Sequence, residues 1–207
     1  MTQCIDLLSR LMPPHPGAGD AVDWDSLERS WGTRFPGDYK EFIARYGAGA
    51  ISDYLVLIPP ESRAEEGAEP TFQGMEEETL NALELWRAKA PGEADRDRVI
   101  AWGLDSSADI LCWHVTGDDP DAWPVAVWNQ DDATWRDYPC GLVEFLCRVL
   151  GAEFDECPLG GLTLWGNASP RFLHHDEEQR LSASGLDPWT GEPDPFAGMF
   201  GQGPADQ

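Results

Sequence analysis

Cys112 and His114 have the types and the spacing that nucleophilic chemistry would need. Residues i and i+2 of a strand share one face, so a thiolate could lie beside its general base. Trp113 and the apolar residues around the pair are equally typical of a packed sheet core. We favour the core interpretation, in which both side chains are buried with their polar atoms satisfied.

A second group of potential chemistry is the run His174-His175-Asp176-Glu177-Glu178, which is a compact cluster of metal-ligand types. Adjacent residues of a helix point about 100° apart, so these side chains converge poorly on one ion. A solvated helix face is the preferred interpretation. We therefore expect no metal and no other cofactor.

The sequence also lacks the local patterns of common enzymes. It has no Gly-x-x-x-x-Gly-Lys phosphate loop, no Gly-x-Gly-x-x-Gly fingerprint, no His-Glu-x-x-His zinc helix and no Gly-x-Ser-x-Gly nucleophile elbow. These absences predict a protein that is not an enzyme, although an uncharacterised catalytic site is not thereby excluded.

Acidic residues gather in two predicted turns that flank one strand. Together with a neighbouring tryptophan they are our candidate partner-binding residues: Asp118, Asp119, Asp121, Trp123, Asp131 and Asp132. If the two turns lie along one rim of the sheet, they concentrate negative potential there, and an exposed Trp beside them would anchor an interface. Solvated turns and a core Trp are the simpler alternatives.

The whole chain is strongly acidic. Its 207 residues contain 38 Asp plus Glu and 14 Lys plus Arg, which gives a formal net charge of −24. Such a chain is repelled by nucleic acid and by anionic membranes, so we expect neither as a partner. The charge favours a basic protein partner, whose association it would accelerate. A merely solubilising surface remains the alternative.

The predicted elements that must position these residues alternate between helices and short strands. Period-two runs predict strands over residues 99–104, 110–116, 125–128 and 134–138. Helical stripes predict a helix that buries Leu80, Leu83 and Trp86, and another from Leu142 to Leu150. Residues 159–165 are a further possible strand, and residues 168–181 a possible terminal helix. The expected fold is α+β, with a mostly antiparallel sheet of about five or six strands packed by helices.

The most readable local structure lies between residues 35 and 58. Apolar residues at Phe35, Tyr39, Phe42, Ile43 and Tyr46 line one face of a helix. Pro36 suits its first turn, Asp38 complements the positive helix end, and Gly47 can end it with a left-handed residue. Residues 51–58 then predict one strand, closed by two prolines.

This stretch resembles the opening of the SUKH superfamily, which includes yeast cell-wall-assembly regulators and many bacterial immunity proteins. The resemblance lies in a Trp, a Leu-Glu pair, a Pro-x-Asp-Tyr-Lys motif and a Tyr-Gly-x-Gly motif. Phe35 replaces the commoner leucine. The matching positions, for which we expect structural roles, are Trp24, Phe35, Pro36, Asp38, Tyr39, Phe42, Tyr46, Gly47 and Gly49.

The resemblance implies a SUKH-like fold and a protein-binding function. Bacterial members neutralise a cognate toxin delivered by contact-dependent competition, often a basic nuclease or another nucleic-acid-modifying domain. The alternative that the resemblance leaves open is a regulatory scaffold that binds cellular proteins without catalysis.

Composition also predicts how the chain is organised. Residues 1–183 are expected to form one SUKH-like domain, and residues 184–207 a Gly- and Pro-rich C-terminal extension that is mobile or loosely docked. The N-terminal residues lack the pattern of a secretory signal, which predicts a cytoplasmic protein. The five cysteines show no Cys-x-x-Cys pair and are expected to be reduced and mostly buried.

Overall fold

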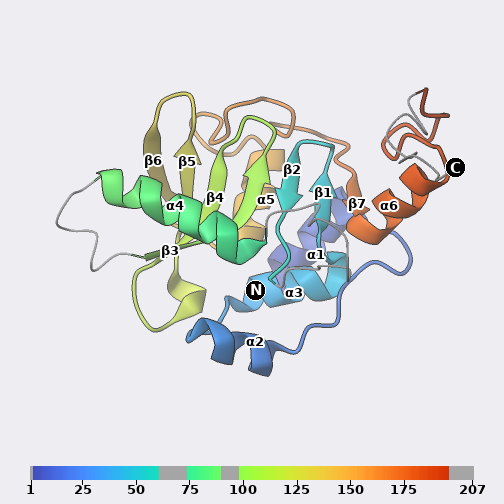
Figure 1. Ribbon diagram of the computed structural model, residues 1–207. Helices are drawn as coiled ribbons and strands as arrows, with labels where there is room; N and C mark the ends of the chain where they lie inside the picture. Colours follow the sequence, from blue (N-terminus) through green and yellow to red (C-terminus); the bar gives the residue numbers. More distant parts are fainter. Residues whose placement is uncertain (1, 61–73, 90–97, 196–207) are drawn as a thin grey trace, which may run out of the picture.

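The structure is a computed structural model that describes residues 2–60, 74–89 and 98–195. Its described part contains one seven-stranded sheet, in the order β6-β5-β4-β3-β2-β1-β7 (Figure 1). Every neighbouring pair of strands is antiparallel. The α+β class with a mostly antiparallel sheet is confirmed, and the sheet has seven strands where five or six were expected.

The elements follow one another along the chain as mixed helices and short strands. The strands are β1 (Gly49–Ile51), β2 (Leu55–Leu57), β3 (Arg98–Asp105), β4 (Ile110–Val115), β5 (Val125–Asn129), β6 (Thr134–Tyr138) and β7 (Phe172–His174). The helices are α1 (Thr2–Leu11), α2 (Trp24–Trp31), α3 (Gly37–Tyr46), α4 (Met75–Lys89), α5 (Leu142–Leu150) and α6 (His175–Ala183), with a 3₁₀ turn η1 (Pro120–Ala122). A search of these helices for one that could span a membrane finds none.

Alternation along the central strands divides the apolar side chains between two cores. In β3, Ile100 and Trp102 pack with α1, α3 and α5, whereas Val99 and Ala101 pack with α4. Helix α4 crosses the sheet over β3, β4 and β6, and no labelled helix lies in front of β1 and β2 in Figure 1. Among the described residues, α1, α3 and α5 therefore pack on one face of the sheet, and α4 packs on the other face over β3, β4 and β6.

The five tryptophans of the central strands and their connections are core residues. They are Trp102, Trp113, Trp123, Trp128 and Trp135, each at most 8% exposed. The cysteines are also mostly buried, as expected, since Cys112, Cys140 and Cys147 are buried and the other two are half-buried.

Helix α3 is the helix predicted between residues 35 and 47, and it buries the predicted face, including Tyr39, Phe42 and Tyr46. Pro36 has an extended ψ of 138°, so it caps the helix and does not lie within the first turn. Gly47 ends the helix with a positive φ of 75°. A side-chain carbon at Gly47 would lie 2.4 Å from the His174 ring, so glycine is required by conformation and by space.

The single strand predicted over residues 51–58 is wrong. The chain reverses at Ser52 and Asp53, and the two flanking runs form the antiparallel hairpin β1–β2. Both turn residues have positive φ, 52° and 53°, as a type I′ turn requires. The Ser-Asp pair carries no glycine, and so the sequence gives no strong turn signal at this point.

Helix α4 buries the predicted face only in part. Trp86 is buried and Leu83 packs against the same core, as expected, but Leu80 is 59% exposed and Ala82 is fully buried. Thr79 explains part of this orientation, because its hydroxyl accepts a hydrogen bond of 3.0 Å from the Ala101 backbone N–H of β3. A polar contact with the central strand β3 thus helps to select which side of the helix faces inward.

Two predictions for the C-terminal third are also wrong. Residues 159–165 form no strand, because the N–H groups of Gly160 and Gly161 donate to the Asp109 carboxylate and the Tyr54 hydroxyl. The helix predicted over residues 168–181 begins only at His175, after β7 has paired with β1.

The described part of the C-terminal extension is docked through Arg171. The Arg171 guanidinium donates to the carbonyls of Pro188 and Trp189, and the latter contact is 2.5 Å long. The Asp187 carboxylate closes a local turn by accepting from the N–H groups of Trp189 and Thr190. Residues 184–195 are thus attached to the domain beside α6.

Candidate functional site

The predicted acidic turns lie at opposite ends of the sheet. Asp118, Asp119 and Asp121 lie between β4 and β5, whereas Asp131 and Asp132 lie between β5 and β6. Consecutive connections of an antiparallel meander leave opposite ends of the shared strand. The two turns therefore do not form one rim, and that part of the prediction is wrong.

Two of the candidate residues in the first turn have structural roles. The Asp121 carboxylate accepts a hydrogen bond of 2.6 Å from the Gly37 N–H at the start of α3. Trp123 is 2% exposed, and its indole N–H donates to the Gly117 carbonyl at 2.7 Å. The prediction of Trp123 as an interface anchor is wrong because its ring belongs to the core. Asp118, Asp119, Asp131 and Asp132 are exposed.

The positions shared with the SUKH pattern hold the framework together. Tyr39 packs edge-on against Trp113 with ring centroids 4.8 Å apart, and its hydroxyl donates to the Ile58 carbonyl. Asp38 accepts a hydrogen bond of 3.0 Å from the Val143 N–H at the start of α5. At Gly49 a side-chain carbon would lie 2.2 Å from the Leu173 carbonyl oxygen of β7. These residues fix α3, α5 and β7 relative to the sheet.

Cys112 and His114 face the α4 side of the sheet. Cys112 is fully buried, and burial raises the pKa of its thiol well above the ordinary value. A thiol that stays protonated is a poor nucleophile. His114 packs against the Trp86 ring and lies 3.3 Å from Asp137. The predicted burial is confirmed for Cys112, whereas His114 is only half-buried.

The run His174–Glu178 is divided between the interior and a cavity. His174 is 5% exposed, contacts Asp20 at 3.2 Å and caps α6 by accepting from the Asp176 N–H. The expectation of a solvated face is therefore wrong for His174. His175 and Glu178, one turn apart, line a cavity that the sequence did not predict.

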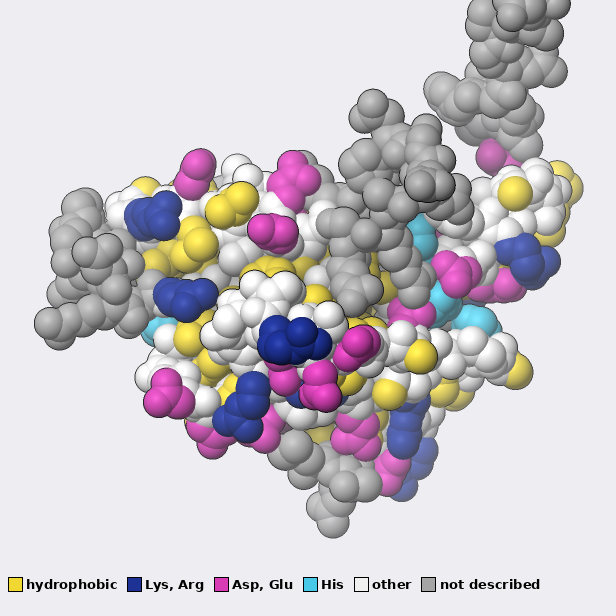
Figure 2. Space-filling view, turned by 60° about the horizontal axis from the view of Figure 1, so that its bottom comes forward, with side chains coloured by type: hydrophobic (Ala, Val, Ile, Leu, Met, Phe, Trp, Pro, Cys, Tyr) yellow, Lys and Arg dark blue, Asp and Glu magenta, His cyan; other side chains and the backbone are white. Residues whose placement is uncertain are grey.

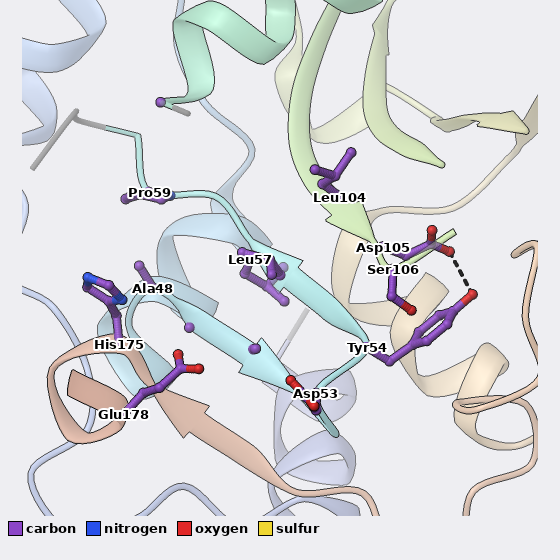
Figure 3. Close-up of a pocket in the computed structure, with 14 residues that line it drawn as sticks. Ala48, Asp53, Tyr54, Leu57, Pro59, Leu104, Asp105, Ser106, His175 and Glu178 are labelled. Atoms are coloured by element: carbon purple, nitrogen blue, oxygen red, sulfur yellow. Dashed lines mark hydrogen bonds between the residues drawn. The ribbon is translucent and has the colours of Figure 1, made fainter. Parts of the chain in front are cut away.

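This cavity has a volume of about 290 Å³ and lies over β1 and β2, between α6 and the N-terminal end of α4 (Figure 3). Its floor is the part of the sheet that α4 does not cover. There the strand register sets Ala50, Val56 and Leu104 side by side across β1, β2 and β3. The floor is apolar because these three residues are cross-strand neighbours whose side chains point to the same face of the sheet.

Carboxylates border the apolar floor. Asp53 projects from the β1–β2 turn and Glu178 from α6, and both lie at the cavity (Figure 3). Burial raises the pKa of Glu178, and the negative charge of Asp53 raises it further. Within the described residues no Lys or Arg forms an ion pair with either group. In the described part of the cavity, two carboxylates and the imidazole of His175 therefore lie beside apolar surface.

One end of the cavity is held by a network of buried polar groups. Tyr54 donates to the Asp105 carboxylate at 2.9 Å, and Asp105 also accepts from the N–H groups of Ser107 and Asp109. Burial raises the pKa of Tyr54 to about 12. The fully buried Asp109 accepts from Gln130 and Gly160 N–H groups. This wall is therefore rigid compared with a solvated turn.

Charge on the surface is distributed more widely than the cavity. Figure 2 shows Asp and Glu side chains scattered over one face of the molecule, with Lys and Arg side chains between them. A diffuse negative field of this kind attracts a basic partner over distance but does not locate its contact. The cavity is the candidate site because charge and apolar surface meet there.

A model of the SUKH_6 family, described as SMI1-KNR4 cell-wall, matches residues 22–146. The match covers more than half of the chain and includes α2, α3 and β1 to β6. Comparison with curated proteins and with solved structures gives no significant match.

Proposed function

The chain belongs to the SUKH_6 family, and from this premise we propose that it is an immunity protein that binds and neutralises a cognate toxin. The proposed toxin is a basic domain, a nuclease or another enzyme that modifies nucleic acid. The observation that carries this proposal is the net charge of −24 on a protein of this family. A toxin that binds nucleic acid needs a basic groove, and carboxylates can occupy the phosphate positions of such a groove.

We propose that neutralisation involves binding without catalysis. The buried thiol of Cys112 stays protonated, and His114 is packed against Trp86. The cavity offers two carboxylates beside an apolar floor, which suits recognition of a partner. This arrangement supports a binding protein, and we propose that it acts in the cytoplasm, where a delivered toxin would act.

The experiment is to express the tagged full chain in its native host and recover it at low salt. Mass spectrometry then identifies any protein present in stoichiometric amount. We expect a basic toxin domain whose activity is lost in the complex and returns when the complex is dissociated. Recovery of a partner that retains full activity in the complex would contradict neutralisation.

Salt dependence provides a second measurement once the partner is known. We expect the association rate to fall steeply as ionic strength rises, because long-range attraction is screened. The variants Asp118→Lys and Asp131→Lys then test the two exposed acidic turns separately, since they lie at opposite ends of the sheet. Charge reversal in a turn that contacts the toxin is expected to lower the affinity for the toxin. Charge reversal in a solvated turn should change only the association rate, and only slightly.

A regulatory scaffold is the second candidate function. The observation that favours it is the description of the matching family as SMI1-KNR4 cell-wall. Such a scaffold would bind several cellular proteins through the same fold. Repeated recovery of several housekeeping proteins, with no inhibited enzyme among them, would support this candidate over immunity.

A further inference from the structure

We propose that the cavity over β1 and β2 receives one lysine or arginine side chain of the protein partner. This inference builds on the proposed function, because it assigns a contact to the basic partner that the function requires. The occupant is selected by the chemistry of the cavity, whose floor is aliphatic and whose border is acidic.

The floor suits the aliphatic stem of such a side chain. Ala50, Val56 and Leu104 form a continuous apolar row across three strands. Lysine and arginine bury their methylene groups along apolar surface while they keep the charged head in a polar environment. A purely apolar side chain would contact the same floor but would leave the bordering carboxylates without a counter-charge.

The border suits the charged head. The Glu178 side chain extends from α6 toward the strands, and Asp53 lies at the hairpin tip, at the β1 side of the floor like Glu178 (Figure 3). Burial raises the pKa of Glu178, and the negative charge of Asp53 raises it further, so the two carboxylates lie close enough to repel each other. A cation between them removes this repulsion and donates hydrogen bonds to both.

The third carboxylate of the cavity contributes charge without a direct contact. Asp105 already accepts hydrogen bonds from Tyr54, Ser107 and Asp109. Its oxygens are thereby held in place, and its negative charge remains fixed at one end of the cavity. This end of the cavity therefore carries a carboxylate held in place before any partner arrives, which favours a cation there.

Ligand geometry argues against a metal ion. The volume of about 290 Å³ leaves room for one long side chain. No group of three His, Cys, Asp or Glu residues suited to a metal ion occurs in the part of the chain that the structure describes. A guanidinium or ammonium head on an aliphatic stem matches both the volume and the chemistry.

The test uses the full chain labelled with ¹⁵N, and Nα-acetyl-arginine amide and Nα-acetyl-lysine amide as probes. Nα-acetyl-norleucine amide is the matched probe, because it keeps the aliphatic stem and lacks the charge. We expect saturable NMR shift changes confined to residues around the cavity, such as Ala50, Asp53, Val56 and Glu178. The norleucine probe is expected to bind roughly fivefold more weakly than the better of the two cationic probes.

The variants Glu178→Gln and Asp53→Asn keep the shape of the side chains and remove one charge each. We expect each to weaken binding of the cationic probe roughly threefold or more and to leave the norleucine probe unaffected. The control Glu84→Gln removes an exposed carboxylate of α4 that does not line the cavity. It is expected to leave the binding of all three probes unchanged.

Two results with the probes would overturn the inference. One is an absence of shift changes at the cavity with both cationic probes, and the other is changes of equal size at exposed acidic residues throughout the molecule. The failure of the proposed function is a separate result, because probe binding is measured without any partner. Suppose that Glu178→Gln and Asp53→Asn no longer bind the cationic probe but bind the isolated toxin with unchanged affinity. The cavity is then not the contact with the partner and the inference fails, whereas the proposal of neutralisation stands.

Discussion

Three carboxylates stabilise backbone groups that lie far away in the sequence. Asp20 accepts from the Ala48 N–H, Asp121 from the Gly37 N–H and Asp38 from the Val143 N–H. The last two donors lie at the starts of α3 and α5, where helices have unpaired N–H groups and a positive dipole end. Part of the acidic excess therefore belongs to the fold itself.

Substitutions of Asp38 test how much its hydrogen bond to the Val143 N–H contributes to stability. We expect Asp38→Ala to lower the free energy of unfolding by about 1–2 kcal/mol, because the Val143 N–H loses its acceptor. Asp38→Asn retains an oxygen acceptor, so a loss of less than about 0.5 kcal/mol is expected. Urea denaturation measures both changes. Equal losses in the two variants would show that the charge, and not the hydrogen bond, matters at this position.

Gly47 is the residue for which we expect the largest single loss of stability. Gly47→Ala combines a positive φ with a contact of 2.4 Å to the His174 ring. We expect a loss of about 3 kcal/mol or more in the free energy of unfolding. Gly32→Ala is the matched control, since its φ is 65° and nothing lies within 4 Å of the added carbon. Its loss should be close to about 1 kcal/mol, the cost of conformation alone.

At the scale of elements, tight turns with positive φ shape the sheet. The β1–β2 hairpin has two such residues, and Ala133 in the β5–β6 turn has a φ of 51°. Without these turns the meander could not keep its register. Each is a place where a residue other than glycine is held in a strained conformation.

We expect Ala133→Gly to stabilise the protein by about 0.5–1 kcal/mol, because glycine adopts positive φ without strain. The control is Ala44→Gly on the exposed side of α3, which should destabilise by about 1 kcal/mol. Thermal and urea unfolding of the two variants measure the difference. A destabilised Ala133→Gly variant would mean that the flexibility gained in the unfolded chain outweighs the strain relieved in the turn.

At the scale of the whole molecule, ionisation opposes folding at neutral pH. Burial raises the pKa values of Asp38, Asp105, Glu78 and Glu178. A carboxyl with a raised pKa stabilises the folded state below its unfolded pKa, near about 4, and this contribution is lost as pH rises through the folded pKa. Self-repulsion within a chain of charge −24 acts in the same direction.

Glu28 contributes to the pH dependence of stability in the opposite direction. Despite the effect of burial, hydrogen bonds from Lys40 and the Phe35 N–H, together with the charges of Lys40 and Arg34, lower its pKa. Its contribution is therefore present above its unfolded pKa and lost as pH falls through the folded pKa.

We predict that the free energy of unfolding is greater at about pH 5 than at about pH 8, by an amount that shrinks at high salt. Denaturation at the two pH values and at fixed ionic strength measures this difference. Asp105→Asn should reduce it, because this variant removes one of the groups with a raised pKa. A greater stability at about pH 8 would contradict the prediction.

Much of the fold could be predicted because it depends on the types of residues that lie close together in the sequence. Helix α3 and strands β3 to β6 follow from apolar periodicity, and the position of Gly47 follows from the end of a helical stripe. The β1–β2 turn and β7 could not be predicted. The turn lacks glycine, and β7 is a short run that becomes a strand only by pairing with β1.

The sequence by itself determined the fold class, the buried face of α3 and the family, because each depends on residue types at short spacing. Tertiary structure alone decided that Asp121 caps α3, that Trp123 is buried and that Asp53 and Glu178 border one cavity. The last pair is separated by 125 residues and meets only because β7 pairs with β1 and carries α6 to the hairpin. Contacts between distant segments depend on strand order and register, which no local pattern encodes.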